Sequence, residues 1–269
     1  MKLVGFEINE NARLGMVEGE EVIDLTATDT SLSPDMTQLL IRSGGDLGFL
    51  RDVATKSKER RPLKGLAYTL PVAKPGKIVC LGLNYLEHAK EGGHKMPEAP
   101  SIFMRCLTSL VAHEQSIIRP KASTMLDYEC ELAVLIGKRG KHVPFNDAYS
   151  IVAGYSCFND ASLRDFQRRT SQWNMGKNFD KTGGFGPWIV TADELAPGAK
   201  GLKIQTRLNG NVLQSDNTDN MMFPVAETIA DVTAGMTLEP GDLLVMGTPS
   251  GVGARRNPPV WMKHGDICE

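Results

Sequence analysis

The stretch Leu126-Asp127-Tyr128-Glu129-Cys130-Glu131-Leu132-Ala133-Val134-Leu135-Ile136 combines a row of carboxylates with a continuous apolar run. The apolar part, Leu132–Ile136, is short and is followed by a glycine-rich turn, which predicts a buried strand. Alternate side chains of an extended chain share one face, so Asp127, Glu129 and Glu131 point the same way. We therefore expect a buried β-strand that begins with three carboxylates on one face.

Spacing alone leaves two interpretations of this acidic row open. Like charges on one strand face repel one another, and a hard divalent cation with oxygen ligands would turn that repulsion into binding. Alternatively, the row is the start of a solvated edge strand, and the carboxylates face water. The pattern is too short to decide between a metal site and a solvated edge.

The chain after Pro71 contains many short β-type runs that glycine and proline separate. One helical pattern, Phe223–Ala234, carries its apolar residues on one face. Strands outnumber helices and do not alternate with them regularly, which argues against a doubly wound sheet and predicts a mixed β fold of the α+β class. The predicted strands are Ile78–Leu81, Leu132–Ile136, Ile151–Tyr155, Trp188–Val190, Lys203–Leu208 and Leu243–Met246, with an Asn209-Gly210 hairpin turn.

The N-terminal residues have a different pattern, a small strand meander followed by short helices. Ser33-Pro34 predicts the N-cap and first position of a helix that Gly44-Gly45 stops. The charged run 56–61 fits a linker, and it fits a solvated helix end equally well. We predict a small domain over residues 1–70 and a larger domain over 71–269. The predicted strands of the small domain are Lys2–Glu7, Ala12–Glu18 and Glu21–Leu25.

Composition narrows the classes of partner and ligand. Of 269 residues, 41% are hydrophobic and 23% charged, and the net charge is −2, so neither nucleic acid nor an anionic membrane is an expected partner. No apolar run approaches the roughly 20 residues that span a bilayer, and no signal peptide is recognisable, which predicts a cytoplasmic protein. The dispersed cysteines and histidines argue against disulfides and zinc, so a bound metal would have oxygen ligands.

Three further positions carry candidate side chains, each with an ordinary alternative. Asp160 follows a predicted strand, where it could supply a metal ligand or cap a helix that starts near Ser162. His88 and Glu91 share a helix face. A carboxylate beside an imidazole orients a general base, but such pairs are also common on solvated helices. Lys177, between Trp173 and a glycine-rich loop, is a further candidate, although a lone lysine is usually a solvated surface charge.

The glycine-rich segment Met246–Gly253 directly follows a predicted strand and lacks the residues of a Walker A loop. Its backbone N–H groups and the Thr248 hydroxyl could bind a carboxylate, or the segment could be an ordinary turn. The polar segment Gly92–Pro97, after His88, is a candidate lid over a substrate.

Taken together, these motifs resemble the fumarylacetoacetate hydrolase family. The resemblance extends from about Pro71 to the C-terminus and implies a β-sandwich or β-roll catalytic core, a small N-terminal domain and a homodimer. Relatives usually continue with another strand or two, so a shortened C-terminus is also expected. The matching motifs, in order, are Gly82-Leu83-Asn84-Tyr85 with His88-Ala89 and Glu91; Asp127-Tyr128-Glu129 with Glu131-Leu132-Ala133; Gly154-Tyr155 with Asn159-Asp160, Arg164-Asp165 and Gln167; Gly176-Lys177 with Phe179-Asp180; Gly186-Pro187-Trp188; Asn209-Gly210; Pro240-Gly241-Asp242; and Gly247-Thr248-Pro249 with Gly251-Val252-Gly253.

The resemblance assigns a metal site to the acidic residues. Glu129, Glu131 and Asp160 match the family's ligands of Mg²⁺, with Mn²⁺ or Ca²⁺ as alternatives. Asp127 belongs to the motif but does not match a usual ligand. An all-oxygen site suits Mg²⁺, which can keep open positions for two oxygens of a keto-acid substrate.

The resemblance also implies catalytic and substrate-binding residues. His88 matches the catalytic histidine, Glu91 its acidic partner, and Lys177 a lysine beside the substrate oxygens. The residues that fall where relatives contact the substrate are Arg105, Gln167 and Thr248.

The activity that follows is Mg²⁺-dependent hydrolysis of a C–C bond in an acylpyruvate or β-diketo acid. Lys177 would stabilise the enolate, and His88, oriented by Glu91, would activate water. The alternative is decarboxylation or isomerisation of a keto acid, of the oxaloacetate or hydroxymuconate type, in the same pocket. A third hypothesis is a non-catalytic, metal-stabilised protein that binds a small acid.

Overall fold

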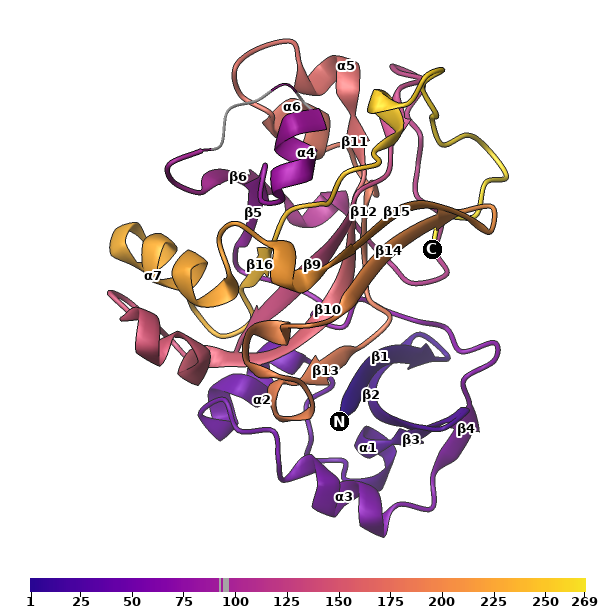
Figure 1. Ribbon diagram of the computed structural model, residues 1–269. Helices are drawn as coiled ribbons and strands as arrows, with labels where there is room; N and C mark the ends of the chain where they lie inside the picture. Colours follow the sequence, from indigo (N-terminus) through magenta and orange to yellow (C-terminus); the bar gives the residue numbers. More distant parts are fainter. Residues whose placement is uncertain (92, 94–96) are drawn as a thin grey trace.

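The computed structural model describes residues 1–91, 93 and 97–269. Within these ranges, twelve strands form one mixed sheet (Figure 1). The path β4-β3-β2-β1-β13-β10-β9-β16-β5-β6 is continuous, β12 branches from β10, and β7 pairs with β12. The strands of this sheet are β1 (Lys2–Ile8), β2 (Asn11–Glu18), β3 (Glu21–Asp24), β4 (Arg60–Pro62), β5 (Ile78–Gly82), β6 (Ser101–Arg105), β7 (Leu110–Ala112), β9 (Cys130–Ile136), β10 (Val152–Asp160), β12 (Gly183–Phe185), β13 (Ile189–Thr191) and β16 (Leu243–Val245).

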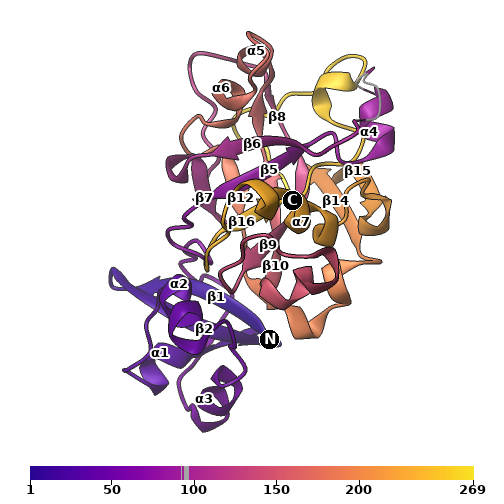
Figure 2. The same cartoon turned by 90° about the vertical axis from the view of Figure 1, so that its left-hand side faces the viewer.

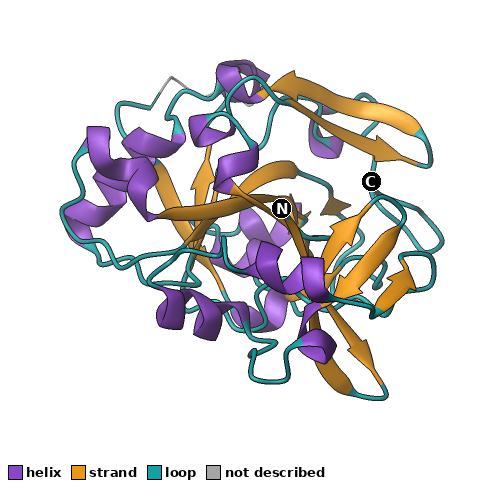
Figure 3. Cartoon of the chain, turned by 90° about the horizontal axis from the view of Figure 1, so that it is seen from below, coloured by secondary structure: helices purple, strands orange, loops and turns teal. Residues whose placement is uncertain are grey.

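The helices are short and lie among the strands along the whole chain, as Figure 3 shows. The predicted α+β class is therefore confirmed. The α-helices are α1 (Leu25–Thr28), α2 (Met36–Ser43), α3 (Leu50–Lys56), α4 (Leu86–Glu91), α5 (Arg164–Gln167), α6 (Asn174–Lys177) and α7 (Val225–Gly235). Six 3-10 helices are described: η1 (Leu107–Ser109), η2 (Phe145–Ile151), η3 (Ala192–Glu194), η4 (Pro197–Ala199), η5 (Thr218–Asn220) and η6 (Gly253–Arg255).

The N-terminal strands β1, β2 and β3 form the predicted meander, and β4 adds a fourth strand within the charged run that was a linker candidate. The predicted start of α2 is wrong, because its N-cap is Asp35 and not Ser33. The Asp35 carboxylate accepts a hydrogen bond from Thr37 N at 2.9 Å, which satisfies a free N–H group of the first turn. The helix ends at Gly44, which has a φ of 63° in the left-handed region, as the sequence predicts.

The N-terminal part joins the rest of the molecule through the main sheet. β1 pairs antiparallel with β13, with Leu3 opposite Ile189. Both of these residues are fully buried in a hydrophobic cluster that also contains Ile78 of β5 and Leu243 of β16. The N-terminal strands extend downward from this junction in Figure 2. The division at residue 70 stays a prediction.

Two small two-stranded sheets complete the fold. β8 (Leu126–Asp127) pairs with β11 (Ser162–Leu163), and β14 (Lys203–Leu208) pairs with β15 (Asn211–Asn217). Asn209 and Gly210 both have positive φ angles, 52° and 78°, which confirms the predicted hairpin turn. No helix in the described part of the chain is both long and apolar enough to cross a membrane.

The pairing of β9 with β10 positions the acidic residues. Phe158 lies opposite Glu131, and the Asp160 N–H donates to the carbonyl oxygen of Glu129 at 2.9 Å. Directly opposed residues share a face of the sheet, so Asp160 is on the face that carries Glu129 and Glu131. Helices α4, α5 and α6 lie at this end of the molecule, opposite the N-terminal strands (Figures 1 and 2).

Candidate metal centre and active site

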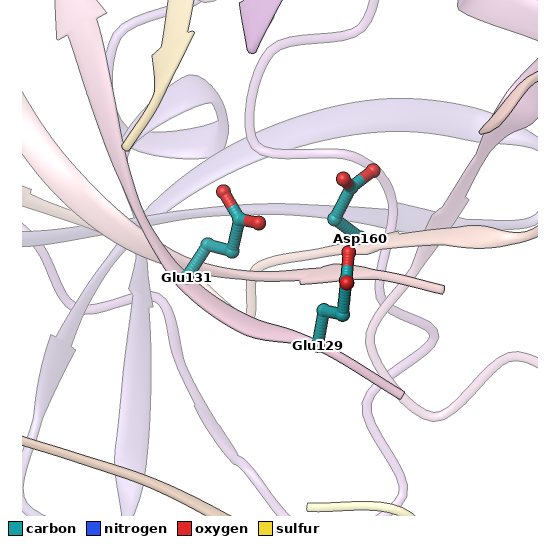
Figure 4. Close-up of side chains that lie close together, drawn as sticks. All are labelled: Glu129, Glu131 and Asp160. Carbon is teal, nitrogen blue, oxygen red and sulfur yellow. The ribbon is translucent and has the colours of Figure 1, made fainter. Parts of the chain in front are cut away.

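Three carboxylates from the two paired strands meet at one point. The ligand oxygens of Glu129, Glu131 and Asp160 all lie within 4.8 Å of one another. Figure 4 shows the side chains of the two glutamates rising from one strand and Asp160 reaching in from its neighbour. Their residues are only 3%, 3% and 0% exposed, so the acidic row is not a solvated strand edge.

The glycine-rich loop after β16 holds the acidic residues in place. The Gly247 N–H donates to Glu131 Oε2 at 2.6 Å, and the Gly251 N–H donates to Glu91 Oε1 at 3.1 Å. Gly247 has a φ of 83°, and an added Cβ would lie 2.7 Å from the Cβ of Asn84. Glycine is therefore required where the backbone turns to present its N–H group. The prediction that this loop binds a carboxylate holds for the carboxylates of the chain itself.

Asp127 has a structural role in the same network. Its carboxylate accepts hydrogen bonds from the N–H groups of Gly253 and Ala254 at 2.7 and 2.9 Å, at the start of η6. It also accepts from Arg164 Nε at 2.7 Å. These donors face its lone pairs, so Asp127 connects η6 to α5 and lies outside the group of three carboxylates.

Two buried cations contact Glu129 directly. Arg164 Nη2 lies 2.6 Å from Glu129 Oε1, and Lys177 Nζ donates to Glu129 Oε2 and, at 2.5 Å, to Asp160 Oδ2. The family resemblance placed Lys177 beside the substrate oxygens and gave Arg164 no role. The signal available was a cation four residues after Asp160, at the start of a short helix.

Asp160 does not cap a helix, since the N-cap of α5 is Leu163. Its second carboxylate oxygen pairs with Arg105 Nη1, whose guanidinium also donates to Thr182 Oγ1 at 2.8 Å. The Arg105 side chain is fully buried behind Asp160. This arginine therefore positions Asp160, and its predicted contact with a substrate stays a prediction.

The buried charges do not balance. Four carboxylates (those of Asp127, Glu129, Glu131 and Asp160) face three cations (Arg105, Arg164 and Lys177), so four negative charges minus three positive charges leaves one negative. Among the described residues, no cation forms an ion pair with the carboxylate of Glu131, whereas Asp127, Glu129 and Asp160 each have one.

The pKa values of the two glutamates move in opposite directions. Burial alone raises the pKa of Glu129, but the charges of Arg164 and Lys177 outweigh burial and hold the pKa well below its usual range. Burial raises the pKa of Glu131 well above its usual range, and the negative charges of Asp160 and Glu129 add to this rise. The chain alone therefore disfavours the Glu131 carboxylate, and a divalent cation among the three groups would stabilise it. The donor set, all carboxylate oxygens, fits a hard cation such as Mg²⁺, Mn²⁺ or Ca²⁺.

The glutamates open onto a cavity of about 310 Å³. One wall is apolar, and Trp173 packs there against Gly82 and edge-on to Phe103 at a ring-centroid distance of 5.9 Å. His88 of α4 also lines the cavity, with Nδ1 3.4 Å from Glu91 Oε2. The structure thus brings the predicted histidine–glutamate pair to the cavity that contains the carboxylates.

Two predicted substrate contacts also lie at the cavity wall. Gln167 lines it, and its Oε1 accepts from Arg164 Nη1 at 2.9 Å, which leaves the amide NH₂ as a donor. Thr248 lines it too, but its hydroxyl donates to the Cys130 carbonyl oxygen at 2.9 Å and accepts from Gln214 at 2.8 Å. A hydroxyl has one proton, so Thr248 cannot donate to a substrate without losing a bond to the backbone. The candidate lid over 92–97 lies largely outside the described residues.

Residues 77–269 match the family model described as fumarylacetoacetate (FAA) hydrolase C-terminal. The chain belongs to this family. The match covers more than half of the chain and includes all the predicted metal ligands and catalytic residues. Membership of the fumarylacetoacetate hydrolase family is thus confirmed.

Individual relatives extend the family resemblance to the whole chain. Oxaloacetate tautomerase Fahd2a, mitochondrial, from Rattus norvegicus is 40% identical over 99% of this chain and 86% of its own length. The solved structure of fumarylacetoacetate hydrolase from Exiguobacterium antarcticum is 34% identical, with a TM-score of 0.86, and covers 100% of this chain and 94% of that one. That of maleylpyruvate hydrolase from Sphingobium sp. SYK-6 in complex with manganese(II) ion and pyruvate is 29% identical, with a TM-score of 0.82, over 100% and 93% of the two chains.

These relatives include a tautomerase as well as hydrolases, so the family supports an enzyme but not one reaction. The buried carboxylates and the manganese complex of one relative support a metal-dependent site. Membership of the fumarylacetoacetate hydrolase family therefore supports an enzyme with a metal-dependent site, and it does not specify the reaction or the metal.

Proposed function

We propose that this protein is a Mg²⁺-dependent tautomerase that interconverts the keto and enol forms of a 2-oxo acid of the oxaloacetate type. The observation that carries the proposal is that His88, which pairs with Glu91, lines the same cavity as Glu129 and Glu131, the two glutamates that cluster with Asp160. The identity of 40% to an oxaloacetate tautomerase along nearly the whole chain supports this reaction over the others. Isomerisation was the sequence-based alternative to C–C bond hydrolysis, and we propose it here as the main reaction.

Glu129, Glu131 and Asp160 would hold the cation, with Mn²⁺ as the first alternative to Mg²⁺. When bound, a divalent cation supplies Lewis-acid stabilisation of negative charge on the substrate's 2-oxo and carboxylate oxygens. Lys177 adds a fixed positive charge beside the same carboxylates, in a site from which water is largely excluded.

His88 is the group that moves the proton. In the keto-to-enol direction, the C–H bond beside the keto carbon breaks and its proton passes to the imidazole. The C–H electron pair forms the C=C bond, the carbonyl π pair moves to the 2-oxygen, and that oxygen takes a proton from water, to which the imidazolium returns the proton it gained. Glu91 accepts from His88 Nδ1, so the other ring nitrogen, Nε2, is left to act as the base. Glu91 is itself fixed by the Gly251 N–H, which orients the pair relative to the cavity.

Hydrolysis of a C–C bond is the second candidate, favoured by the likeness to maleylpyruvate hydrolase. In that reaction His88 would take its proton from water, and the hydroxide would attack the distal carbonyl of an acylpyruvate. The two reactions use the same residues and differ in what loses the proton.

The test is to follow loss of the enol form of oxaloacetate by its ultraviolet absorbance, with Mg²⁺ and with EDTA. We expect Mg²⁺-dependent catalysis that His88→Ala lowers by about 10²- to 10⁴-fold. Lys90→Ala is the matched control on the same helix, because Lys90 is exposed and forms an ion pair with Glu87, also exposed, on the helix surface. Rapid cleavage of acylpyruvates without enol turnover would replace the tautomerase with the hydrolase.

A further inference from the structure

We propose that Gln214 is a positioning residue, which holds the glycine-rich loop against the metal-ligand strand β9 and so directs two backbone N–H groups at the site. One is the Gly247 N–H, which donates to Glu131 Oε2 at 2.6 Å. The other is the Gly251 N–H, which donates to Glu91 Oε1 at 3.1 Å. This inference rests on the proposed function for its metal site, and it applies to either candidate reaction. The sequence motifs assigned Gln214 no role.

Gln214 comes from outside the main sheet. It lies on β15, in the two-stranded sheet of β14 and β15, and it is only 1% exposed. Its partner directly across the hairpin is Thr206, whose hydroxyl donates to Gln214 Oε1 at 2.7 Å. This hairpin contributes none of the three clustered carboxylates, so Gln214 acts on the site through other residues.

The Gln214 amide connects the ligand strand to the loop. Its Oε1 accepts from the N–H of Cys130, the residue between the two glutamates, at 3.0 Å. Its Nε2 donates to Thr248 Oγ1 and to the Pro249 carbonyl oxygen, both at 2.8 Å. Thr248 and Pro249 directly follow Gly247 in the loop. The Thr248 hydroxyl completes the connection, because it donates to the Cys130 carbonyl oxygen at 2.9 Å.

Among side chains of this size, only the glutamine amide suits all of these partners. The Cys130 N–H and the Thr206 hydroxyl donate, so they need an acceptor, whereas the Pro249 carbonyl needs a donor. A glutamate carboxylate would offer acceptors to both sides, and a methionine would offer no donor. Each partner left unpaired in this buried position would cost the desolvation of its polar group.

The neighbouring residue of β15, Leu213, contacts the loop a second time. An added Cβ at Gly251 would lie 2.3 Å from the Leu213 carbonyl oxygen, and Gly251 has a φ of 97°, so this close approach requires glycine. Arg256 donates from Nη2 to the same carbonyl oxygen and from Nε to the Gly251 carbonyl oxygen at 3.3 Å. β15 therefore holds the loop near both N–H groups, through Gln214 beside Gly247 and through Leu213 at Gly251.

The loop orients the groups on which the site depends. The Gly247 N–H contacts Glu131, the glutamate whose charge a divalent cation would stabilise. The Gly251 N–H fixes Glu91, the partner of His88. Because β15 fixes the loop before any cation binds, these N–H groups do not have to be ordered at binding. Loss of contacts that orient metal ligands typically weakens metal affinity by about 10- to 100-fold.

The test replaces Gln214 by Met, which is similar in size and cannot donate. We expect the Kd for Mg²⁺, measured by titration calorimetry, to rise about 10- to 100-fold. In the metal-free protein, the amide hydrogens of Gly247 and Gly251, followed by NMR, should exchange about tenfold faster or more. Thr248→Val is a milder variant, because it keeps the Gln214 bond to the Pro249 carbonyl, and its Kd should rise by up to about tenfold.

The matched control is Thr218→Val, in η5 directly after β15. Thr218 is also buried, and its hydroxyl donates to the Ala199 carbonyl oxygen at 2.6 Å and accepts from the Leu202 N–H at 3.0 Å. The variant therefore loses buried hydrogen bonds next to the same hairpin but keeps the contacts of Gln214. We expect the Kd for Mg²⁺ and the exchange of the loop amides to stay unchanged, whatever its Tm.

Three results would overturn this role of Gln214: natural Mg²⁺ affinity in Gln214→Met, loop amides that exchange no faster, or the same changes in Thr218→Val. Thermal unfolding establishes that each variant is folded, and Thr248→Val carries the same comparison if Gln214→Met does not fold.

Failure of the proposed function has a separate signature, because neither measurement needs turnover. A natural protein that binds no Mg²⁺ would refute the proposed metal site, and the exchange rates would still decide whether Gln214 holds the loop. A protein that binds Mg²⁺ through this arrangement but does not convert enol-oxaloacetate would refute the tautomerase and leave the role of Gln214 intact.

Discussion

Replacing Glu131 by Gln tests the idea that this carboxylate is held for a cation and not for the fold. Glu131 is buried, its pKa is raised by burial and by Asp160 and Glu129, and its Oε2 accepts a hydrogen bond from the Gly247 N–H at 2.6 Å. Without metal, the neutral form is therefore favoured. A glutamine side chain has nearly the same shape, is also neutral and can accept the same hydrogen bond. We expect the metal-free variant to be as stable as the natural protein, within about 1 kcal/mol, or more stable.

Replacing Glu129 by Gln is the matched comparison, because Glu129 lies two residues before Glu131 on the same face. Glu129 contacts both Arg164 and Lys177, so its loss leaves two buried cations short of a partner. Breaking a buried ion pair in this way costs about 3 kcal/mol or more. For a chain of this size that corresponds to a fall in Tm of roughly 5–10 °C. The same chemical change at two neighbouring ligands should thus affect the metal-free protein in different ways.

The metal response should be alike in both variants. At Mg²⁺ about 100 times its Kd, binding to the folded state stabilises the natural protein by about 2.7 kcal/mol. Either substitution should remove most of this gain. Differential scanning calorimetry with EDTA and with Mg²⁺ measures both quantities. The reasoning is refuted if metal-free Glu131→Gln unfolds as early as Glu129→Gln, or if Mg²⁺ still stabilises it fully.

Further predictions concern pH, packing and the proton-transfer pair. Because the pKa of Glu131 is raised in the metal-free protein, Mg²⁺ binding releases a proton. The affinity for Mg²⁺ should therefore rise with pH, by up to about tenfold per pH unit below that pKa. Calorimetry in buffers of different ionisation enthalpy should detect the released proton. An added Cβ at Gly82 would lie 2.0 Å from Trp173 Cζ3. Gly82→Ala should therefore lower the free energy of unfolding by about 1–3 kcal/mol and change the tryptophan fluorescence. An unchanged fluorescence spectrum would contradict this packing. Glu91→Gln should lower kcat less than His88→Ala and shift the pH–rate profile, whereas identical losses would argue against an orienting role.

The sequence specified much of the local structure of this protein. The apolar run of β9, the Asn209-Gly210 turn and the glycine end of α2 follow from side-chain pattern and backbone preference over a few neighbouring residues. The N-cap of α2 was misplaced by two residues, since Ser33 and Asp35 are both good caps and only the backbone geometry selects one. Family motifs added residue roles that no local pattern could supply, and the predicted homodimer and cytoplasmic location remain predictions.

The candidate site depends on contacts that local patterns do not encode. The acidic row alone fitted a solvated edge as well as a metal site. Its burial, and the arrival of Asp160, come from the β9–β10 register. Gly247 reaches Glu131 across 116 residues of sequence. The roles of Arg105 and Arg164 follow in the same way from which carboxylates they meet in space.

Sequence by itself determined which residue types are available, namely carboxylates on one strand face, a histidine–glutamate pair on a helix and a glycine-rich loop. Tertiary structure decided which of the carboxylates are neutralised by the protein and which one is not. The physical reason is that the charge state of a buried group depends on desolvation and on the partners within a few ångströms, and those partners are brought together only by folding.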